Sequence, residues 1–199
     1  MLHPSTELRS VNARIGVGVF ATEFIPAGTI TWALCALDQT ISPARFDALP
    51  ELSREYLRKY TYVDAVGDRV LCGDNARFIN HHCEATCLLV GARLEIAVRD
   101  IRAGEELTDE YGALNIEEPF ECACGSRECR GQIHPTDVLR YGSLWDAKVA
   151  SVLPLLAAVP QPLLGVVQGD PEIDELLTGR RRPNVRTQYW AGLGASTAP

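Results

Sequence analysis

Seven cysteines constrain this 199-residue chain more strongly than any other feature. Three of them, Cys122, Cys124 and Cys129, follow a C-x-C-x4-C spacing, and Cys83 lies far upstream. Three thiolates in one tight loop leave a tetrahedral zinc ion one ligand short, and Cys83 can complete an all-thiolate site by folding back. The spacing therefore predicts a zinc ion that pins a C-terminal flap onto the segment around Cys83.

The other three cysteines, Cys35, Cys72 and Cys87, are predicted to be small core residues. Cys87 is close enough to Cys83 in sequence to be an alternative zinc ligand. The start of the chain lacks the basic-then-apolar pattern of a signal peptide, so we expect a cytoplasmic protein, or a nuclear one in a eukaryote. A reducing compartment favours metal binding and buried thiols over disulfides. No apolar run reaches the roughly 18 residues that span a bilayer, so no membrane association is expected.

The net charge of -7 argues against direct nucleic-acid binding, which requires a basic face. An acidic chain attracts a basic partner such as a tail rich in lysine and arginine, although simple solubility explains the charge equally well. Hydrophobic residues make up 46% of the chain and charged residues 23%, as is ordinary for a globular protein. The length allows one domain with a core and a modest extension.

The first half of the chain predicts short strands separated by turn residues. The expected strands cover residues 8–11, 15–21, 29–34, 60–63, 69–72, 87–90 and 94–98. Turns that contain Gly67 and Gly91 are expected to join the last four of these strands into two hairpins. Ser42 is expected to cap a short helix that begins at Pro43, and a second helix is expected over residues 51–59.

One short pattern occurs twice, at residues 24–29 and 100–105, where Ala-Gly follows an apolar residue and a spacer. Gly28 and Gly104 can supply the positive φ that a tight turn needs, so we expect two equivalent turns.

The composition shifts near residue 134 and predicts a helical C-terminal extension. Residues 144–159 are expected to form a helix that Pro154 kinks or splits, and residues 160–170 a linker. A short acidic helix over residues 171–178 should end at Gly179, and the following arginines should lie on a solvated surface. Residues 194–199 are expected to be disordered. The extension can pack on the domain, pair two copies, or bind a partner.

Four segments now resemble one family, the SET domains. Residues 16–21 resemble its opening glycine motif, and residues 77–86 resemble its R-F-I-N-H-S-C-x-P-N signature. Residues 104–111 are similar to G-E-E-L-T-[FY]-D-Y, and the late cysteines are similar to the post-SET pattern C-x-C-x4-C-R-G. The order and spacing of the segments agree with the family over about residues 8–133.

The resemblance implies a mainly β fold, in which small curved sheets surround a knot-like C-terminal threading, with short helices and the helical extension. It divides the chain into a SET domain over residues 8–115, a post-SET zinc flap over 116–134, and the extension over 135–199.

The resemblance implies an S-adenosylmethionine-dependent methyltransferase that acts on the ε-amine of a lysine in a protein, such as a basic histone tail. Free lysine has a pKa of about 10.4, so the site must desolvate the amine and let it lose a proton. Alignment of the amine with the methyl group can lower the barrier by roughly 7–11 kcal/mol. The family achieves this in a narrow channel, which the cofactor and the lysine enter from opposite faces.

The family's motifs carry site roles onto particular residues of this chain. Tyr111 matches the catalytic tyrosine, and Tyr60 or Tyr62 is expected to line the channel, with help from Trp32. Asn80 and His81 match residues that hold the cofactor. The remaining cofactor-binding residues implied are Gly16, Val17, Gly18, Arg77, Phe78, Phe120 and Ile133.

Several of these residues also have plainer interpretations. Gly16 and Gly18 let the backbone approach the cofactor, although alone they would predict only a hairpin turn. Arg77 and Phe78 are expected to support the binding loop from inside. Ile133, like Phe120, packs either on the adenine or in the core.

By the same resemblance Cys83, Cys122, Cys124 and Cys129 ligate a structural zinc ion. Such a zinc ion has no open coordination position and takes no hydrolytic part. It would order the flap that walls the cofactor and lysine channel.

The chain departs from the family pattern in two places. His82, Ala85 and Thr86 replace serine, proline and asparagine, and we expect these changes to loosen the threaded segment. Asp109-Glu110 replaces the usual aromatic-Asp before the tyrosine, which we expect to widen the channel or to change the number of methyl groups added.

Two other functions fit parts of the sequence. A SET fold with altered motifs can be a catalytically weak or inactive interaction module, although the chain retains Tyr111, Asn80 and His81. A small zinc-binding nucleic-acid protein is the second rival, and the negative charge argues against it.

Overall fold

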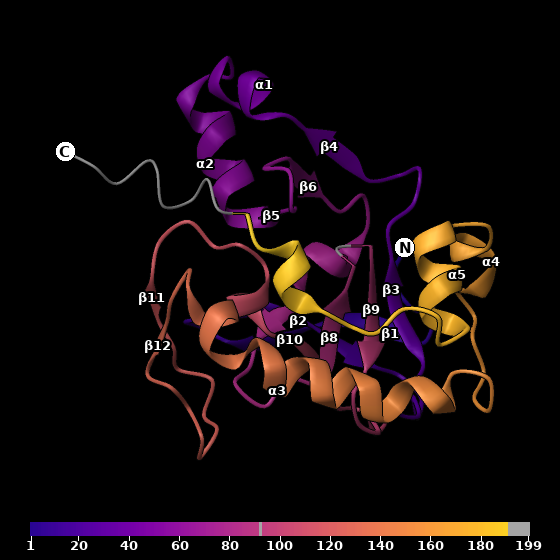
Figure 1. Cartoon of the computed structure of the whole chain (residues 1–199). Helices are drawn as coiled ribbons and strands as arrows, with labels where there is room; N and C mark the ends of the chain where they lie inside the picture. Colours follow the sequence, from indigo (N-terminus) through magenta and orange to yellow (C-terminus); the bar gives the residue numbers. More distant parts are fainter. Residues whose placement is uncertain (92, 191–199) are drawn as a thin grey trace.

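A computed structural model describes residues 1–91 and 93–190 of the chain. Small sheets occupy the middle of the molecule, two short helices cover one end, and a long helix crosses one face (Figure 1). The predicted mainly β fold of small sheets with short helices is confirmed. No helix within the described ranges is long and apolar enough to cross a bilayer.

A four-stranded sheet contains two of the sequence motifs. Its order is β1 (Thr6–Asn12), β2 (Gly16–Ala21), β10 (Glu106–Asp109) and β7 (Asn80–His81). The β10–β7 pair is parallel, whereas the other pairs are antiparallel. This parallel pair aligns the segment that precedes Tyr111 with the Asn-His pair, although the two lie far apart in sequence.

A second sheet forms the centre of the core. It contains β3 (Ile30–Ala33), β9 (Leu94–Ala97) and β8 (Cys87–Val90), and every residue of these strands is buried. The predicted hairpin between β8 and β9 is confirmed by their antiparallel register. Strands covered on both faces are expected to be almost continuously apolar, and Glu95 in β9 is a buried exception.

The third sheet lies with the two short helices at one end of the molecule (Figure 1). The sheet contains β4 (Gln39–Ile41), β6 (Arg69–Leu71) and β5 (Thr61–Val63). The two helices are α1 (Pro43–Asp47) and α2 (Glu51–Tyr60). The predicted hairpin between β5 and β6 is confirmed. Ser42 caps α1 as predicted, and its side chain accepts a hydrogen bond from the Arg45 amide at 3.4 Å.

The two Ala-Gly turns contact each other. Ile25 and Ile101 exchange backbone hydrogen bonds of 2.9 and 2.8 Å, and Gly28 and Gly104 have φ values of +88° and +84°. The two equivalent turns predicted from the repeated pattern are therefore confirmed. A Cβ atom on Gly28 would lie 2.8 Å from Leu155 Cβ, so glycine also lets the C-terminal extension approach this turn.

The flap is a minimal hairpin of β11 (Phe120–Glu121) and β12 (Gln132–Ile133), at the left in Figure 1. Its ladder pairs only Phe120 with Ile133 and Glu121 with Gln132. A ladder this short contributes little stability of its own, so the flap depends on other contacts.

The C-terminal extension is helical, with boundaries that partly differ from the expected ones. Helix α3 (Asp137–Val152) begins earlier than predicted and ends before Pro154, which lies in a 3-10 helix (Leu153–Leu155). Helix α4 (Leu164–Val167) interrupts the segment expected to be a linker, so that expectation was wrong. Helix α5 (Pro171–Leu177) is confirmed, and Gly179, its predicted stop, has a positive φ. The predicted disorder of residues 194–199 lies outside the described ranges. Further 3-10 helices cover Asn75–Phe78, Tyr111–Ala113 and Val185–Gln188.

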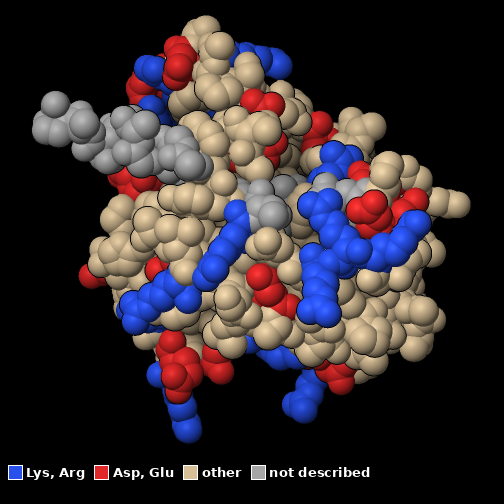
Figure 2. Space-filling model, in the orientation of Figure 1, with Lys and Arg blue, Asp and Glu red and all other residues tan. Residues whose placement is uncertain are grey.

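The extension packs on the domain and shares its core. Helix α3 runs across the strands in Figure 1, and Val138, Trp145 and Val149 from α3 join Leu88 and Ile96 in one buried cluster. On this face basic side chains lie among acidic ones, so the net negative charge is not concentrated there (Figure 2). The sequence allowed the extension to pack on the domain, to pair two copies, or to bind a partner. The structure shows that the extension packs on the domain.

Removal of the Trp145 side chain tests whether α3 is part of the folding unit. Trp145 is 4% exposed, so we expect Trp145→Ala to lower the free energy of unfolding by about 3–5 kcal/mol. The neighbouring Leu144 is 55% exposed, and Leu144→Ala is the control, with an expected change below about 0.5 kcal/mol. Urea denaturation measures both, and an equal effect of the two variants would contradict the shared core.

Candidate active site and metal centre

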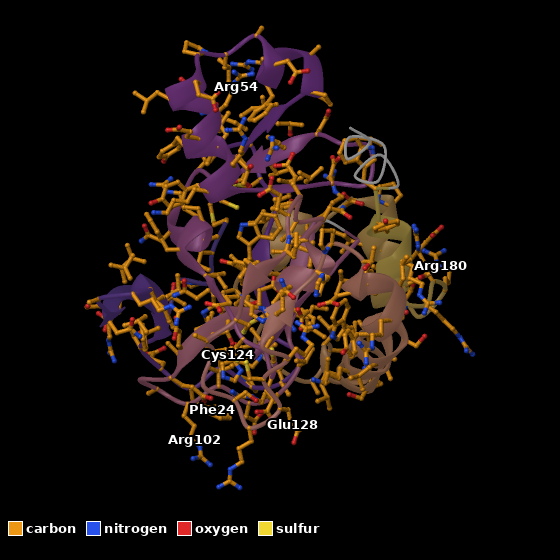
Figure 3. The ribbon with its side chains drawn as sticks, turned by 90° about the vertical axis from the view of Figure 1, so that its left-hand side faces the viewer. Phe24, Arg54, Arg102, Cys124, Glu128 and Arg180 are labelled. Atoms are coloured by element: carbon orange, nitrogen blue, oxygen red, sulfur yellow. The ribbon has the colours of Figure 1, made fainter. Side chains whose placement is uncertain are left out.

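The four cysteines of the predicted zinc site come together. The Sγ atoms of Cys83, Cys122, Cys124 and Cys129 all lie within 4.8 Å of one another, and Cys83 Sγ is 3.8 Å from Cys122 Sγ. A tetrahedral zinc ion with Zn–S distances of about 2.3 Å separates its sulfur ligands by roughly 3.8 Å. The cluster is therefore able to hold zinc, and Figure 3 labels Cys124 in it.

Backbone amides prepare two of these thiols for metal binding. The Arg130 amide donates to Cys83 Sγ at 3.5 Å, and the Gly131 amide donates to Cys129 Sγ at 3.4 Å. The Gly131 amide lowers the pKa of Cys129 to about 7, whereas burial raises the pKa of Cys83 and Cys122. A divalent cation would offset both the burial and the mutual repulsion of the thiolates.

The alternative ligand Cys87 is not in this cluster. It lies in β8, is fully buried, and belongs to the hydrophobic core with Cys72. The prediction of small core residues is confirmed for these two, whereas Cys35 is half-buried.

Tyr111 follows β10 and is held at both ends. Its hydroxyl donates to the Ile79 carbonyl at 2.6 Å, and its backbone amide donates to His81 Nδ1 at 3.2 Å. Burial raises the pKa of Tyr111 and lowers the pKa of His81 to about 4. The phenol therefore stays protonated, and a neutral imidazole can accept the amide proton at Nδ1 and direct its Nε2 towards Cys83 Sγ, 3.5 Å away.

Three aromatic rings meet where the flap reaches the domain. The centroid of His81 lies 5.6 Å from that of Tyr111 and 6.0 Å from that of Phe120, and Tyr111 and Phe120 are 6.1 Å apart. Phe120 is half-buried, whereas its strand partner Ile133 is fully buried. This difference favours core packing for Ile133 and leaves the Phe120 ring available to a ligand.

The glycine motif lies against Asn80. Asn80 Nδ2 donates to the Val17 carbonyl at 3.0 Å and to Glu106 Oε1 at 2.7 Å. A Cβ atom on Gly18 would clash with Glu106 Oε1 and approach Asn80 Nδ2, so glycine leaves room for this contact as the side chains are placed. Gly16 has a φ of +91°, and its position opens onto free space.

Arg77 and Phe78 precede the Asn-His segment and contact each other, and their support of that segment stays a prediction. Arg77 Nη1 donates to the Cys72 carbonyl at 3.3 Å, and the guanidinium lies 5.0 Å from the Phe78 ring centroid. The Phe78 ring packs edge-on against Tyr60.

A cavity of about 1010 Å³ lies beside Tyr111 and Phe120, and the glycine motif, Asn80 and His81 are not among the residues that line it. Tyr60, Tyr62, Tyr111 and Phe120 all line it, so the predicted channel residues are brought together. Trp32 also lines it and meets Tyr62 edge-to-face at a centroid distance of 6.0 Å.

Arg130 is a site residue that the sequence reasoning missed. Its Nη2 donates to Glu110 Oε1 at 2.5 Å, and its Nη1 lies 3.2 Å from Asp137 Oδ2 at the start of α3. Burial raises the pKa of Glu110 to about 7, against the opposing effect of Arg130. The available signal was the arginine directly after the last cysteine in C-R-G.

Trp190 is a second missed residue. It lines the cavity, and its amide donates to Asn115 Oδ1 at 3.0 Å. A Cβ atom on Gly67 would lie 2.7 Å from the Trp190 ring, so the end of the extension packs closely on the turn between β5 and β6. No sequence motif predicts this contact.

The altered threaded segment is hydrogen-bonded to β10. The Thr108 amide donates to Thr86 Oγ1 at 2.8 Å, and the Thr86 amide donates to Thr108 Oγ1 at 3.1 Å. The His82 amide donates to the Asp109 carbonyl at 3.1 Å. These bonds join residues 82–86 to β10, and the expected loosening stays a prediction.

The comparisons with known proteins agree with these motifs. Residues 16–112 match the family model of the SET domain. The chain therefore belongs to the SET-domain family over these residues.

The curated relatives are named as histone-lysine methyltransferases. The H3 lysine-4-specific enzyme of Schizosaccharomyces pombe is 37% identical over 36% of this chain, and Drosophila melanogaster trithorax is 40% identical over 33%. A "probable inactive" histone-lysine N-methyltransferase, SUVR1 of Arabidopsis thaliana, is 32% identical over 37%. The chain spans only 8%, 2% and 13% of these three relatives.

One solved structure in the comparison is KRYPTONITE in complex with mCHG DNA and SAH. It is 26% identical, with 62% of this chain and 28% of that chain covered, and the TM-score is 0.44.

Loss of one thiol tests the metal centre. We expect Cys124→Ser to release zinc and to disorder the flap, because the two-residue ladder of β11 and β12 cannot hold it alone. Metal content measured by mass spectrometry should fall, and proteolysis within residues 115–135 should accelerate, while the core strands stay folded. Cys35→Ser, outside the cluster, is the control and should keep its zinc. Undiminished zinc in Cys124→Ser would contradict the assignment.

Proposed function

We propose that this chain is an S-adenosylmethionine-dependent methyltransferase that modifies the ε-amine of a lysine in a basic protein tail, such as a histone. One observation carries the proposal. Tyr111, whose hydroxyl donates to the Ile79 carbonyl at 2.6 Å, lines the same cavity as Tyr60, Tyr62 and Phe120. The SET-domain match and the names of the curated relatives support it.

The residues around the Asn-His pair suit an adenine-bearing cofactor. The Phe120 ring is half-buried and beside His81, and the backbone at Gly16 opens onto free space. S-adenosylmethionine, when bound, supplies the methyl group on a positively charged sulfur. Phe120 and His81 would offer an aromatic surface for the adenine, and Asn80 with the glycine motif would form the opposite wall.

The cavity residues would prepare the lysine amine. Aromatic side chains would desolvate it, which favours loss of its proton. The Tyr111 hydroxyl oxygen can accept an N–H from the amine, because its own proton is already committed to Ile79. The amine lone pair is then held in one direction, as an in-line displacement requires.

The zinc cluster would act through the flap. Phe120 belongs to β11, one residue from Glu121 and close to the cysteine loop, so zinc would fix the ring that contacts His81 and Tyr111. Structural zinc of this kind stabilises local folding and leaves no open ligand position for chemistry.

A basic protein substrate agrees with the charge of the chain. The net charge of the chain is -7. Electrostatic attraction would speed the encounter with a lysine-rich tail.

The direct test is incubation of the full chain with a labelled methyl donor and a panel of histones and ribosomal proteins. We expect label on lysine side chains, located by mass mapping of the product. Transfer to no member of the panel, together with no binding of the cofactor, would contradict the proposal.

Tyr111→Phe separates catalysis from cofactor binding. We expect turnover to fall by at least about tenfold, since the hydroxyl contact worth roughly 1.4 kcal/mol or more is lost in the transition state. Cofactor affinity should stay near normal, because the ring and the His81 contact remain. Tyr56→Phe, on the exposed face of α2, is the control. Equal turnover of Tyr111→Phe and the unmodified chain would remove Tyr111 from the mechanism.

An inactive SET-fold interaction module is the second candidate. The relative named as an inactive methyltransferase and the altered Asp109-Glu110 pair favour it. Isothermal titration with S-adenosylmethionine separates the two candidates, because a module without transferase function is expected to show no heat of binding.

A further inference from the structure

Two buried acids line the cavity beside the candidate catalytic tyrosine. Asp109 ends β10 and is 1% exposed, and Glu95 in the adjacent core sheet is 7% exposed. Both side chains line the same cavity as Tyr111 and Tyr62. Acidic side chains are almost never buried this deeply unless they are paired or hold a ligand.

The two carboxyl groups interact with each other rather than with a cation. The neighbouring Asp109 raises the pKa of Glu95 beyond the effect of burial, and two buried carboxyl groups so placed keep one proton between them. Apart from that shared proton, no donor in the described part of the chain reaches Glu95 Oε2 or Asp109 Oδ2. Among the described residues, no arginine, lysine or histidine forms an ion pair with either acid.

Negative charge prevails around the pair, since Asp109 and Asp74 raise the pKa of Glu95 while the N-terminal ammonium group lowers it. Burial raises the pKa of Asp109 to about 6 and that of Glu95 well above its usual range, and it also raises the pKa of Cys72 and of Tyr62. Carboxylates add to the shift at Cys72 and Tyr62, so this part of the cavity has an excess of negative potential. A cation bound here would relieve it.

Aromatic side chains complete the wall around the acids. Trp32 is 1% exposed, lines the cavity, and meets the Tyr62 ring at 89°. Its indole Nε1 is buried and has no hydrogen-bond partner within the described ranges. This N–H group is therefore unsatisfied, like one oxygen of each acid. Aromatic faces beside a carboxylate are a favourable environment for an ammonium group.

Resting on the proposed function, we propose that Glu95 and Asp109 form a one-proton acid pair that binds the ammonium group of the substrate lysine and that Asp109 accepts its proton. The pair carries one negative charge, which matches the single positive charge of a lysine side chain. An N–H bond of the ammonium breaks, its proton passes to Asp109 Oδ2, and the nitrogen keeps the electron pair as a neutral amine. The buried pair then holds two protons and no net charge.

Binding of a small cation tests this without any methyl transfer. The full chain is titrated with n-butylammonium chloride and with butan-1-ol at constant ionic strength, and NMR chemical shifts report the dissociation constants. We expect the unmodified chain to prefer the ammonium at least about tenfold, as for a hydrogen bond between charged groups in a buried site. Equal affinity for the alcohol would overturn the inference and requires no variant.

Substitutions that keep the side-chain shape test whether the two acids cause the preference for the ammonium. Asp109→Asn and Glu95→Gln should each reduce the affinity for butylammonium about tenfold or more and leave butan-1-ol binding unchanged. Glu118→Gln is the matched control, because Glu118 lines the same cavity but is exposed at its mouth. A loss in Glu118→Gln equal to that in Asp109→Asn would show a general charge effect and overturn the role of the pair.

Methyl transfer then separates this inference from the proposed function. If the unmodified chain and Asp109→Asn methylate lysine peptides at equal rates, the acid pair has no role although the function stands. If the unmodified chain transfers no methyl but binds butylammonium through Asp109, the function fails and the cation site stands. We expect kcat/KM for the peptide to fall at least about tenfold in Asp109→Asn, with cofactor affinity within about twofold.

Discussion

Arg130 is the interaction on which the site depends, because it joins the thiol cluster to the tyrosine motif and to α3. Its amide donates to Cys83 Sγ, and its guanidinium contacts both Glu110 and Asp137. A half-buried guanidinium between two carboxylates holds its neighbours in place, because its removal would leave both buried acids without their cation. Since Glu110 directly precedes Tyr111, metal binding at the flap and the position of the phenol are mechanically connected.

The C-terminal extension is part of this arrangement and not an appendage. Helix α3 supplies Asp137 to Arg130 and Trp145 to the main core, and Tyr141 lies 5.0 Å from the guanidinium. The end of the extension then returns to the cavity through Trp190. The two-residue ladder of the flap is therefore supplemented by Arg130 at one point, and a metal ion in the thiol cluster would fix the flap at another.

The sequence was most informative where local chemistry determines the structure. The Ser42 cap, the β8–β9 hairpin and the positive φ at Gly28 follow from turn and capping rules, and the thiol cluster follows from ligand spacing. Helix α4 was missed because Leu163 and Val167 are buried only through contacts made in the folded chain. The local sequence, taken alone, resembles a linker. The same reason applies to Arg130 and Trp190, whose partners lie far away in sequence. Glu95 was missed because nothing in its strand marks it as facing another acid.

The two departures before Tyr111 are best understood together. The resemblance leads one to expect an aromatic residue at position 109 and aspartate at 110, and the chain has Asp109 and Glu110. Each new acid has a specific buried neighbour, Glu95 for Asp109 and Arg130 for Glu110. Because an unpaired buried carboxylate costs several kcal/mol, two such substitutions persist only where partners or a ligand offset them. Glu110 is paired with a protein cation, whereas Asp109 meets a second acid, which is why we propose that this acid pair binds an ammonium group from outside the chain.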